Sequence, residues 1–338
     1  MNLPKINNCP GTLAEGFDTY STAFLRKMYN GKLVSHILTY ESPKISEEDA
    51  EEFIENRKRI SISGVQEKLS LLLDKNNLRL TKEEEQGTYI LKPIPRDIKK
   101  PDQAPANEHL TMQIAKQVYG INTAENALVF FKSGEPAYIT LRFDVKPNGT
   151  KWRNEDFASL AGRTKDNGGA DYKYHYSYEE LGRLIKLYVP AWKVEIERYF
   201  QLVIFNYLFS NGDAHLKNFG LLESGTGDFI LSPAYDLLNT KLHVNDSDFG
   251  LNHGLFADNY RSPAWKINGN PNAADFKEFG RRIGLSDLRT DKLLEHFLIR
   301  HQMVENLTAR SYLSEPMKKS YLLDYNNKRN LLVRGYKN

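Results

Sequence analysis

The chain has 338 residues, of which 40% are apolar, 26% charged and 12% aromatic. A chain of this length buries a sizeable core and is expected to divide into about two domains. Lys and Arg number 46 against 43 Asp and Glu, and the resulting net charge of +3 is too small to indicate a nucleic-acid or membrane surface. The single cysteine, Cys9, excludes an internal disulfide framework and a cysteine-based zinc site, and it suits a reducing compartment.

The sequence gives no sign of export or membrane insertion. The first residues, MNLPKINNCPG, lack the basic and then apolar pattern of a secretion signal. The most apolar stretch, Phe200 to Phe209, is interrupted by Gln201 and Asn206 and is far shorter than the roughly 20 residues that span a bilayer. We therefore expect a cytoplasmic protein with no membrane partner.

The first part of the chain predicts one helix followed by strands. Residues 1–60 have a mixed composition and end in an acidic run over 45–60, which predicts a helix that begins near Ser46. Residues 61–74 and 77–93 then carry short apolar runs bounded by Asn, Asp, Gly and Pro, a pattern typical of strands and their turns.

A helix and a second pair of strands are predicted next. Residues 107–121 place Leu110, Ile114 and Val118 four positions apart and contain a stop at Gly120, which predicts a helix. Residues 126–145 predict two strands around a Ser-Gly turn.

The second half of the chain is predicted to be mainly helical. Residues 176–189 and 194–212 are apolar at three- and four-residue spacing, and the second helix is expected to stop at Asn211-Gly212. A hairpin over 219–237 and a helical tail over 290–332 follow. We therefore predict an α+β, two-lobed, protein-kinase-like fold, with a strand-rich N-terminal lobe over residues 1–145 and a helical C-terminal lobe over 146–338.

The segment NGDAHLKNF, directly after an apolar helix, carries the strongest chemical signal. Asp213 and Asn218 stand five residues apart, the spacing of an acceptor-orienting base and a metal-binding amide in phosphotransferases. Asp236, across the predicted hairpin, supplies a second carboxylate, and Mg²⁺ prefers such oxygen ligands. In the alternative interpretation Asn-Gly-Asp is turn chemistry and Asp236 is a helix cap. The ordered set of three favours phosphoryl transfer.

Two further residues extend this set. Lys92 ends an apolar strand, where a bound phosphate would account for a cation, and Glu108 on the following helix is a candidate to pair with it. Taken alone, each residue fits an ordinary role better, because strand-end lysines often extend to solvent and Glu108 fits a solvated helix face.

The turn SISGVQ, residues 61–66, precedes the predicted lysine strand. Kinases place a nucleotide-covering turn there, although the single Gly64 matches the glycine-rich pattern GxGxxG poorly. Backbone N–H groups of such a turn bind phosphates. The residues alone do not separate this interpretation from a plain polar turn before a strand.

Histidine and tyrosine residues give weaker signals. His215 lies near Asp213, but no second histidine stands at a ligand spacing, so we do not expect a zinc site. Tyr172, Tyr174, Tyr176 and Tyr178 alternate in a polar context, which fits either a substrate-facing loop or an ordinary loop of the second lobe.

Seven segments together resemble the HipA-like serine/threonine kinase toxins, in the same order and at similar intervals. They are SISGVQEKLSLLL, YILKPIP, NEHLTMQIAKQVYGI, RFDV, NEDFASLAG, NGDAHLKNFGLL and LSPAYDLLNT. The resemblance runs from about Ser61 to beyond Asp236. It implies a two-lobed kinase that uses ATP and Mg²⁺.

The resemblance assigns roles residue by residue. Asp213 resembles the catalytic aspartate, Asn218 and Asp236 the metal ligands, and Ser61 the autophosphorylated serine, with Ser63 as a second hydroxyl. The implied nucleotide contacts come from the covering loop, the lysine strand, the hinge and the loops of the second lobe: Ser63, Gly64, Val65, Gln66, Glu67, Lys68, Lys92, Leu141, Arg142, Phe143, His215, Lys217, Asn218, Tyr235 and Asp236.

Two departures from the family pattern matter. Long HipA proteins carry a further N-terminal subdomain, whereas 60 residues precede Ser61 here, so the chain resembles the short HipT-type form and its missing portion is expected as a separate HipS-like protein. The family usually has an acidic residue where this chain has Leu141 in its hinge, so that side-chain contact is in doubt.

The resemblance implies a protein Ser/Thr kinase toxin that arrests growth by phosphorylating an aminoacyl-tRNA synthetase. A HipB-like DNA-binding antitoxin is the implied partner, and DNA is contacted only through it. One alternative is a nucleotide-binding interaction or co-repressor module without kinase activity, which the Asp213, Asn218 and Asp236 set disfavours. The other is a small-molecule or lipid kinase, which the sequence does not exclude.

Overall fold

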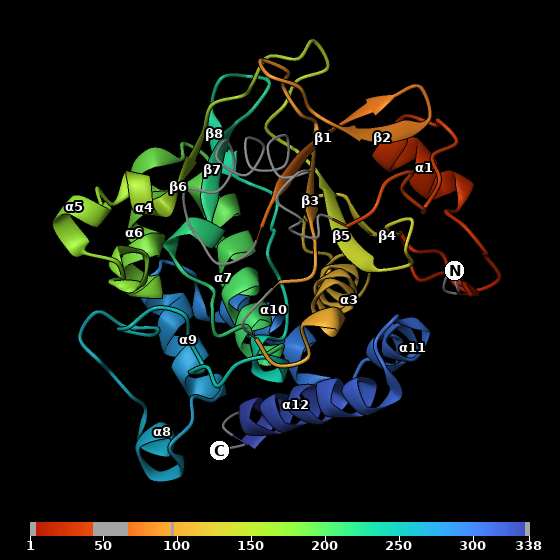
Figure 1. The fold of residues 1–338 in the computed structure, drawn as a ribbon. Coiled ribbons are helices and arrows are strands. Elements are labelled where there is room, and N and C mark those ends of the chain that lie inside the picture. The colour runs from red at the N-terminus through yellow and green to blue at the C-terminus, as the bar shows by residue number, and fades with distance from the viewer. Residues whose placement is uncertain (1–4, 43–66, 96–97, 335–338) are drawn as a thin grey trace. The chain divides into compact units, whose positions relative to one another are not determined.

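The computed structural model describes residues 5–42, 67–95 and 98–334. The chain divides into two compact units, and Figure 1 labels its helices and strands. The first comprises Met1–Ile114, Ala124–Thr150 and Met303–Lys318; the second comprises Ala115–Thr123, Lys151–Gln302 and Lys319–Asn338. The helix predicted over 45–60 lies outside the described residues, and the division at residue 145 stays a prediction.

Within the described part of the first unit, five strands form one antiparallel sheet in the order β2-β1-β3-β5-β4. The strands are β1 (Leu69–Asp74), β2 (Asn77–Leu80), β3 (Tyr89–Lys92), β4 (Asn126–Phe130) and β5 (Pro136–Leu141). Leu91 in the central strand pairs with Leu69 on one side and Ile139 on the other. These three side chains are fully or almost fully buried, so the apolar runs that predicted strands do form the interior of the sheet.

Helix α1 (Thr22–Tyr29), which sequence analysis did not predict, completes the core of this unit. Ser21 caps it by accepting a hydrogen bond from the N–H of Phe24, and Asn30 ends it in the left-handed conformation. Its buried face packs into the same apolar cluster as Leu71 and Leu91. Helix α3 (Ala104–Gln117) follows β3 after the turn η1 (Pro101–Gln103), and α11 (Gln302–Arg310) belongs mainly to this unit.

The second unit is mainly helical, as predicted, with a small sheet. The hairpin β7 (Gly220–Glu223) and β8 (Phe229–Leu231) forms, and a strand that was not predicted, β6 (Asn154–Asp156), pairs with β7. The helices are α4 (Phe157–Leu160), α5 (Lys165–Gly168), α6 (Tyr178–Tyr188), α7 (Trp192–Leu208), α8 (Pro263–Asn268), α9 (Ala273–Arg282), α10 (Asp287–Leu298) and α12 (Glu315–Arg334), with short turns η2 (Tyr172–Tyr174), η3 (Leu216–Asn218) and η4 (Thr240–Leu242).

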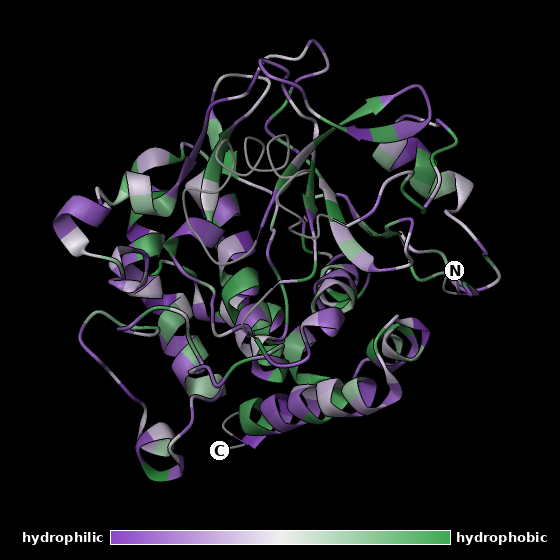
Figure 2. Ribbon diagram, in the orientation of Figure 1, coloured by the Kyte–Doolittle hydropathy of each residue, from purple (hydrophilic) through white to green (hydrophobic). Residues whose placement is uncertain are grey.

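Helix α7 forms the centre of this unit and is buried on most of its surface. Its apolar residues belong to the hydrophobic (green) segments of Figure 2. Phe200 stacks on Phe279 of α9 at a centroid distance of 5.9 Å. At the end of α7, Phe209 stacks on Phe205 and on Tyr325 of α12. Such contacts hold the C-terminal end of α7 rigidly against its neighbours.

The end of α7 differs from the sequence prediction. The helix stops at Leu208, not at Asn211-Gly212, and Ser210 takes the left-handed conformation with φ 53°. The N–H of Asn211 donates to the carbonyl of Asn206 at 2.8 Å, and that of Ser210 to the carbonyl of Tyr207 at 3.2 Å. These two bonds form a Schellman motif, in which serine replaces the usual glycine. The prediction failed because serine rarely adopts positive φ and no local signal marks it.

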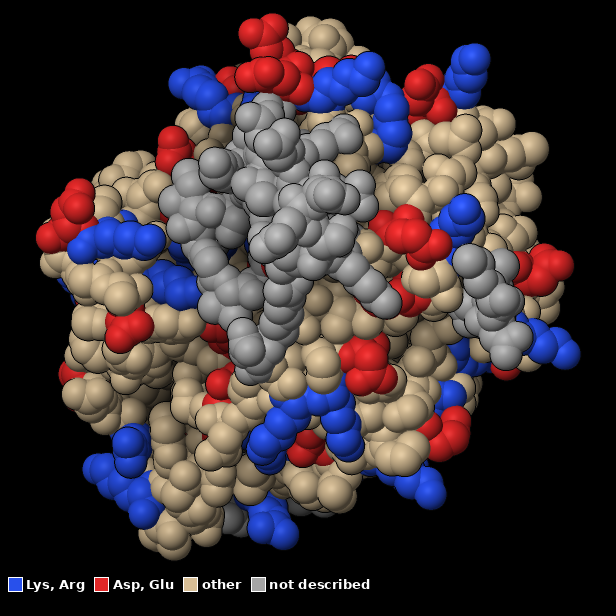
Figure 3. All heavy atoms as spheres, viewed as in Figure 1, with Lys and Arg blue, Asp and Glu red and all other residues tan. Residues whose placement is uncertain are grey.

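Charged side chains of both signs are interspersed on the face that Figure 3 shows, in keeping with the small net charge. Among the residues that the structure describes, no helix is both long and apolar enough to cross a membrane.

Candidate active site

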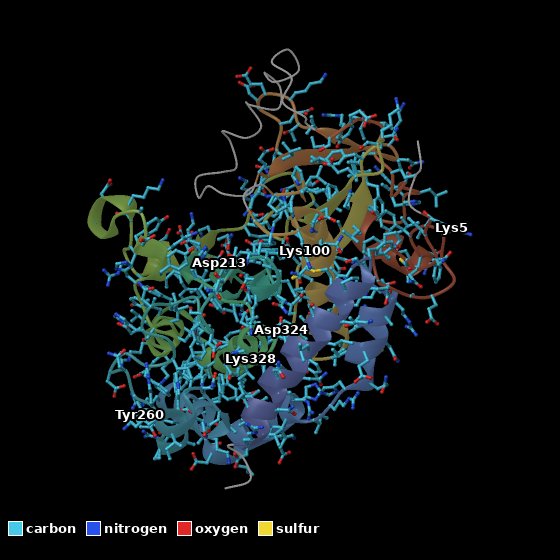
Figure 4. The ribbon with its side chains drawn as sticks, turned by 60° about the horizontal axis from the view of Figure 1, so that its bottom comes forward. Lys5, Lys100, Asp213, Tyr260, Asp324 and Lys328 are labelled. Carbon is cyan, nitrogen blue, oxygen red and sulfur yellow. The ribbon has the colours of Figure 1, made fainter. Side chains whose placement is uncertain are left out.

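Asp213 projects from the loop that follows α7 in the second unit, where Figure 4 labels it. The Schellman motif turns the chain out of the helix, and the Asn211 side chain then secures the loop. Its amide nitrogen donates to the Asn206 side chain at 2.8 Å and to the backbone carbonyl of Asp236 at 3.3 Å. One buried amide therefore links the Asp213 loop to the segment that carries Asp236.

Thr240 holds the same loop from another side. Its hydroxyl accepts a hydrogen bond from the N–H of Gly212 at 2.9 Å and donates to the carbonyl of Ser210 at 3.0 Å. Gly212 is required for space: a Cβ there would lie 2.5 Å from the carbonyl oxygen of Ser247. The glycine that predicted a helix stop therefore serves close backbone approach instead.

Asn218 and Asp236, the two predicted metal ligands, lie side by side. The Asn218 amide nitrogen donates to Oδ2 of Asp236 at 3.2 Å, and its oxygen accepts the N–H of His215 at 3.1 Å. Asp236 has φ 56°, a strained conformation for a residue other than glycine. Strain of this kind concentrates at functional sites, where the surrounding structure enforces it. Tyr235 supports the pair, because its hydroxyl donates to the carbonyl of Lys217 at 2.8 Å.

Asp213 is exposed, and several charged and polar groups lie near its carboxylate. Tyr174 donates its hydroxyl to Oδ1 of Asp213 at 2.8 Å. Desolvation raises the pKa of Asp213, and the charges of Asp246 and Asp236 add to this rise, while the Tyr174 hydrogen bond and Lys173 oppose it. The net direction is upward, so Asp213 holds a proton more readily than an ordinary aspartate.

His215 is buried next to Asp213 and remains neutral. Burial lowers its pKa to about 3, and the positive charges of Lys173 and Lys217 act in the same direction. Its ring packs edge-on against Tyr174 at a centroid distance of 5.3 Å. The imidazole therefore packs beside Tyr174 and carries no charge in the physiological range.

Two residues that sequence analysis did not assign to the site also shape the loop. The hydroxyl of Tyr178, the first residue of α6, donates to the carbonyl of Ala214 at 2.7 Å and accepts the N–H of Gly250 at 3.3 Å. A Cβ on Gly250 would lie 2.5 Å from the nitrogen of Ala214. The alternating tyrosines were the one signal for Tyr178, whereas the contact of Gly250 joins segments far apart in the chain.

The first unit brings together Lys92 and Glu108. Lys92 Nζ lies 2.6 Å from Oε1 of Glu108, and both side chains are at most 5% exposed. The solvent-exposed alternatives considered for each residue are therefore excluded. Lys92 also lies 5.2 Å from the ring centroid of Tyr138. A buried pair of this kind is costly to desolvate, so it points to a role beyond stability.

The remaining predicted nucleotide contacts are only partly described. Glu67 and Lys68 lie immediately before β1, and Ser61, Ser63, Gly64, Val65 and Gln66 lie outside the described residues. In the predicted hinge, the N–H of Leu141 donates to the carbonyl of Glu125 and that of Arg142 to the carbonyl of Thr88, both at 2.8 Å. Arg142 also pairs with Asp144 at 2.6 Å. Adenine recognition by these two residues would therefore use groups other than their N–H.

The donor chemistry fits the implied cofactors. Asp236 and Asn218 present a carboxylate and an amide oxygen, which are hard donors of the kind that Mg²⁺ binds together with nucleotide phosphates. Lys92 supplies a buried cation on a strand end. Within the second unit, Asn218 and Asp236 would hold the magnesium of a nucleotide, and Asp213 would address the acceptor hydroxyl.

A family model for the HipA-like C-terminal domain matches residues 60–306. The chain belongs to this family. A Haemophilus influenzae protein named "Putative kinase" is 28% identical, over 94% of this chain and 93% of that protein. "Putative kinase Y4dM" of Sinorhizobium fredii is 31% identical over 62% of this chain, which spans about half (52%) of that relative.

Two solved structures share the fold of this HipA-like chain. One is from the Shewanella oneidensis MR-1 toxin-antitoxin complex of HipA, HipB and operator DNA, with 21% identity and a TM-score of 0.60, covering 86% of this chain and 72% of that one. The other is the Helicobacter pylori proinflammatory kinase CtkA, with 14% identity and a TM-score of 0.51, covering 78% and 94%. The predicted α+β, kinase-like fold is confirmed.

Replacing Gly250 with alanine should impair any reaction at Asp213. The new Cβ would push on the backbone of Ala214, the residue next to Asp213, and misplacing a reacting group by about 1 Å costs on the order of 10²-fold in rate. Steady-state kinetics of phosphoryl transfer test this. Gly225→Ala is the matched control, because a Cβ there meets no atom within 4 Å. Equal activity of the two variants would contradict the expectation.

The role of the buried ion pair can be separated from its stability effect. Lys92→Met removes the cation that lies 2.6 Å from the buried Glu108 carboxylate and should lower the free energy of unfolding by about 3–5 kcal/mol. Adding Glu108→Leu should restore most of that stability, because no buried charge remains. Phosphoryl transfer should be lost in both variants. If the stable double variant regained transfer, the pair would be purely structural.

The pKa of Asp213 predicts the acid limb of the pH profile. Its carboxylate must be ionised to accept the hydroxyl proton, so transfer should fall as pH drops through its raised pKa, above the ordinary aspartate value of about 3.9. His215, with a pKa of about 3, does not contribute in this range. Measuring kcat/KM against pH, with ATP affinity determined at each pH, checks this. An acid limb with an apparent pKa at or below the ordinary aspartate value would refute this expectation.

Proposed function

We propose that this HipA-like chain is an ATP- and Mg²⁺-dependent protein kinase that phosphorylates serine or threonine. The observation that carries the proposal is the cluster of Asn218 and strained Asp236 held beside the Asp213 loop. The names of the curated relatives and the fold shared with CtkA support it. Bound Mg²⁺ would neutralise phosphate charge during transfer.

In this proposal each residue of the site has a separate role. Asp213 would orient the acceptor hydroxyl and accept its proton, Asn218 and Asp236 would hold the metal, and Lys92, oriented by Glu108, would contact a nucleotide phosphate. His215 remains neutral and packs beside the base. Autophosphorylation at Ser61 and Ser63, which lie outside the described residues, is part of the proposal and rests on the sequence resemblance.

We further propose a toxin role. The Shewanella oneidensis HipA structure, which includes HipB and operator DNA, supports a HipB-like DNA-binding antitoxin as the partner of this chain. The short form with a separate HipS-like protein, and an aminoacyl-tRNA synthetase as the target, rest on the sequence resemblance.

Asp213→Asn should abolish transfer of labelled phosphate from ATP while leaving the melting temperature close to that of the unchanged protein, because the charge is lost and the volume is kept. Asp236→Asn should instead weaken binding of the magnesium nucleotide. Both variants are compared in a lysate of the native host, where labelled products are identified by mass spectrometry. A labelled protein supports the proposal, and a labelled lipid or metabolite points to the alternative kinase class. Near-normal transfer by Asp213→Asn would overturn the catalytic assignment.

A further inference from the structure

Tyr174 belongs to the alternating tyrosines and lies at the end of η2 in the second unit. Its backbone is anchored: the N–H of Asn252 donates to the carbonyl of Tyr174 at 2.9 Å, and that of His253 to the carbonyl of Tyr176 at 3.2 Å. The segment is therefore tied to a distant part of the unit. These bonds fix where the Tyr174 side chain begins.

The Tyr174 side chain reaches the proposed base. Its hydroxyl lies 2.8 Å from Oδ1 of Asp213, and its ring packs edge-on against His215. This distance falls within the range of about 2.6–3.2 Å over which a general base addresses the proton it removes. A hydroxyl in this position makes the contact that a substrate hydroxyl needs.

We propose that Tyr174 occupies the acceptor position on Asp213, so that an incoming serine or threonine hydroxyl must displace it. Tyr174 is then a determinant of acceptor selection, because only acceptors that bind well enough to replace its hydrogen bond reach the base. The inference rests on the proposed kinase function. It differs from a positioning role, in which the same hydrogen bond would hold Asp213 in its productive orientation.

The two roles predict opposite changes in kinetics. Tyr174→Phe keeps the ring against His215 and removes the hydroxyl from Asp213. If Tyr174 competes with the acceptor, the KM for a protein acceptor falls by about tenfold, the size expected for one hydrogen bond to a charged group, and kcat is maintained. If it positions Asp213, kcat falls and KM stays unchanged.

The test uses the full chain with ATP and Mg²⁺, and myelin basic protein as a general acceptor. Transfer to that protein and ADP release without it are measured for the unchanged chain and for Tyr174→Phe, and phosphate on Tyr174 is measured for the unchanged chain. The matched control is Tyr176→Phe, which removes the same atom from a ring that lies 5.9 Å from the guanidinium of Arg163. Thermal melting confirms that each variant is folded.

A lower KM, or faster ADP release as water gains access to Asp213, supports the proposal when it occurs in Tyr174→Phe and not in Tyr176→Phe. Detection of phosphate on Tyr174 also supports the proposal, because phosphoryl transfer to the Tyr174 hydroxyl requires that hydroxyl to lie at the acceptor position. A fall in kcat alone, or no difference between the two variants, overturns it while the kinase function stands. Absence of both transfer and ADP release from the unchanged chain would instead refute the proposed function.

Discussion

The site of the second unit depends on how helix α7 ends. The helix is buried and its last turn is clamped by stacked aromatic rings, so its end has a defined place in the core. Ser210 then takes a conformation that costs about 1–2 kcal/mol for a residue with a Cβ, and the two bonds of the Schellman motif offset that cost. This turn fixes the direction in which the chain leaves the core, and Asp213 lies three residues beyond Ser210.

Beyond that turn, the loop is held by contacts from segments far away in the sequence. Asn211 bonds the backbone of Asp236, Thr240 bonds both Ser210 and Gly212, and Tyr178 bonds Ala214. Backbone groups on both sides of Asp213, those of Ser210, Gly212 and Ala214, are therefore hydrogen-bonded. A reacting carboxylate gains from such support, because a fixed orientation need not be established again in each turnover.

The first unit contains a buried lysine at the end of an apolar strand. Lys92 ends the central strand and is buried, so Glu108 from α3 compensates its charge at 2.6 Å. An apolar pair would be at least as stable in this position. The presence of the ion pair is thus better explained by a demand for a cation at the strand end than by stability.

Local sequence patterns were enough to predict much of the fold and of the candidate site. Apolar patterns located the strands other than β6, together with α3, α6 and α7, and residue type with spacing singled out Asp213, Asn218 and Asp236 before any fold was known. Tertiary structure alone decided the rest. The left-handed Ser210 and Asp236, the close approach of Gly250 to Ala214 and the hydrogen bond from Tyr174 to Asp213 all depend on packing between distant segments, which leaves no periodic signal in the sequence.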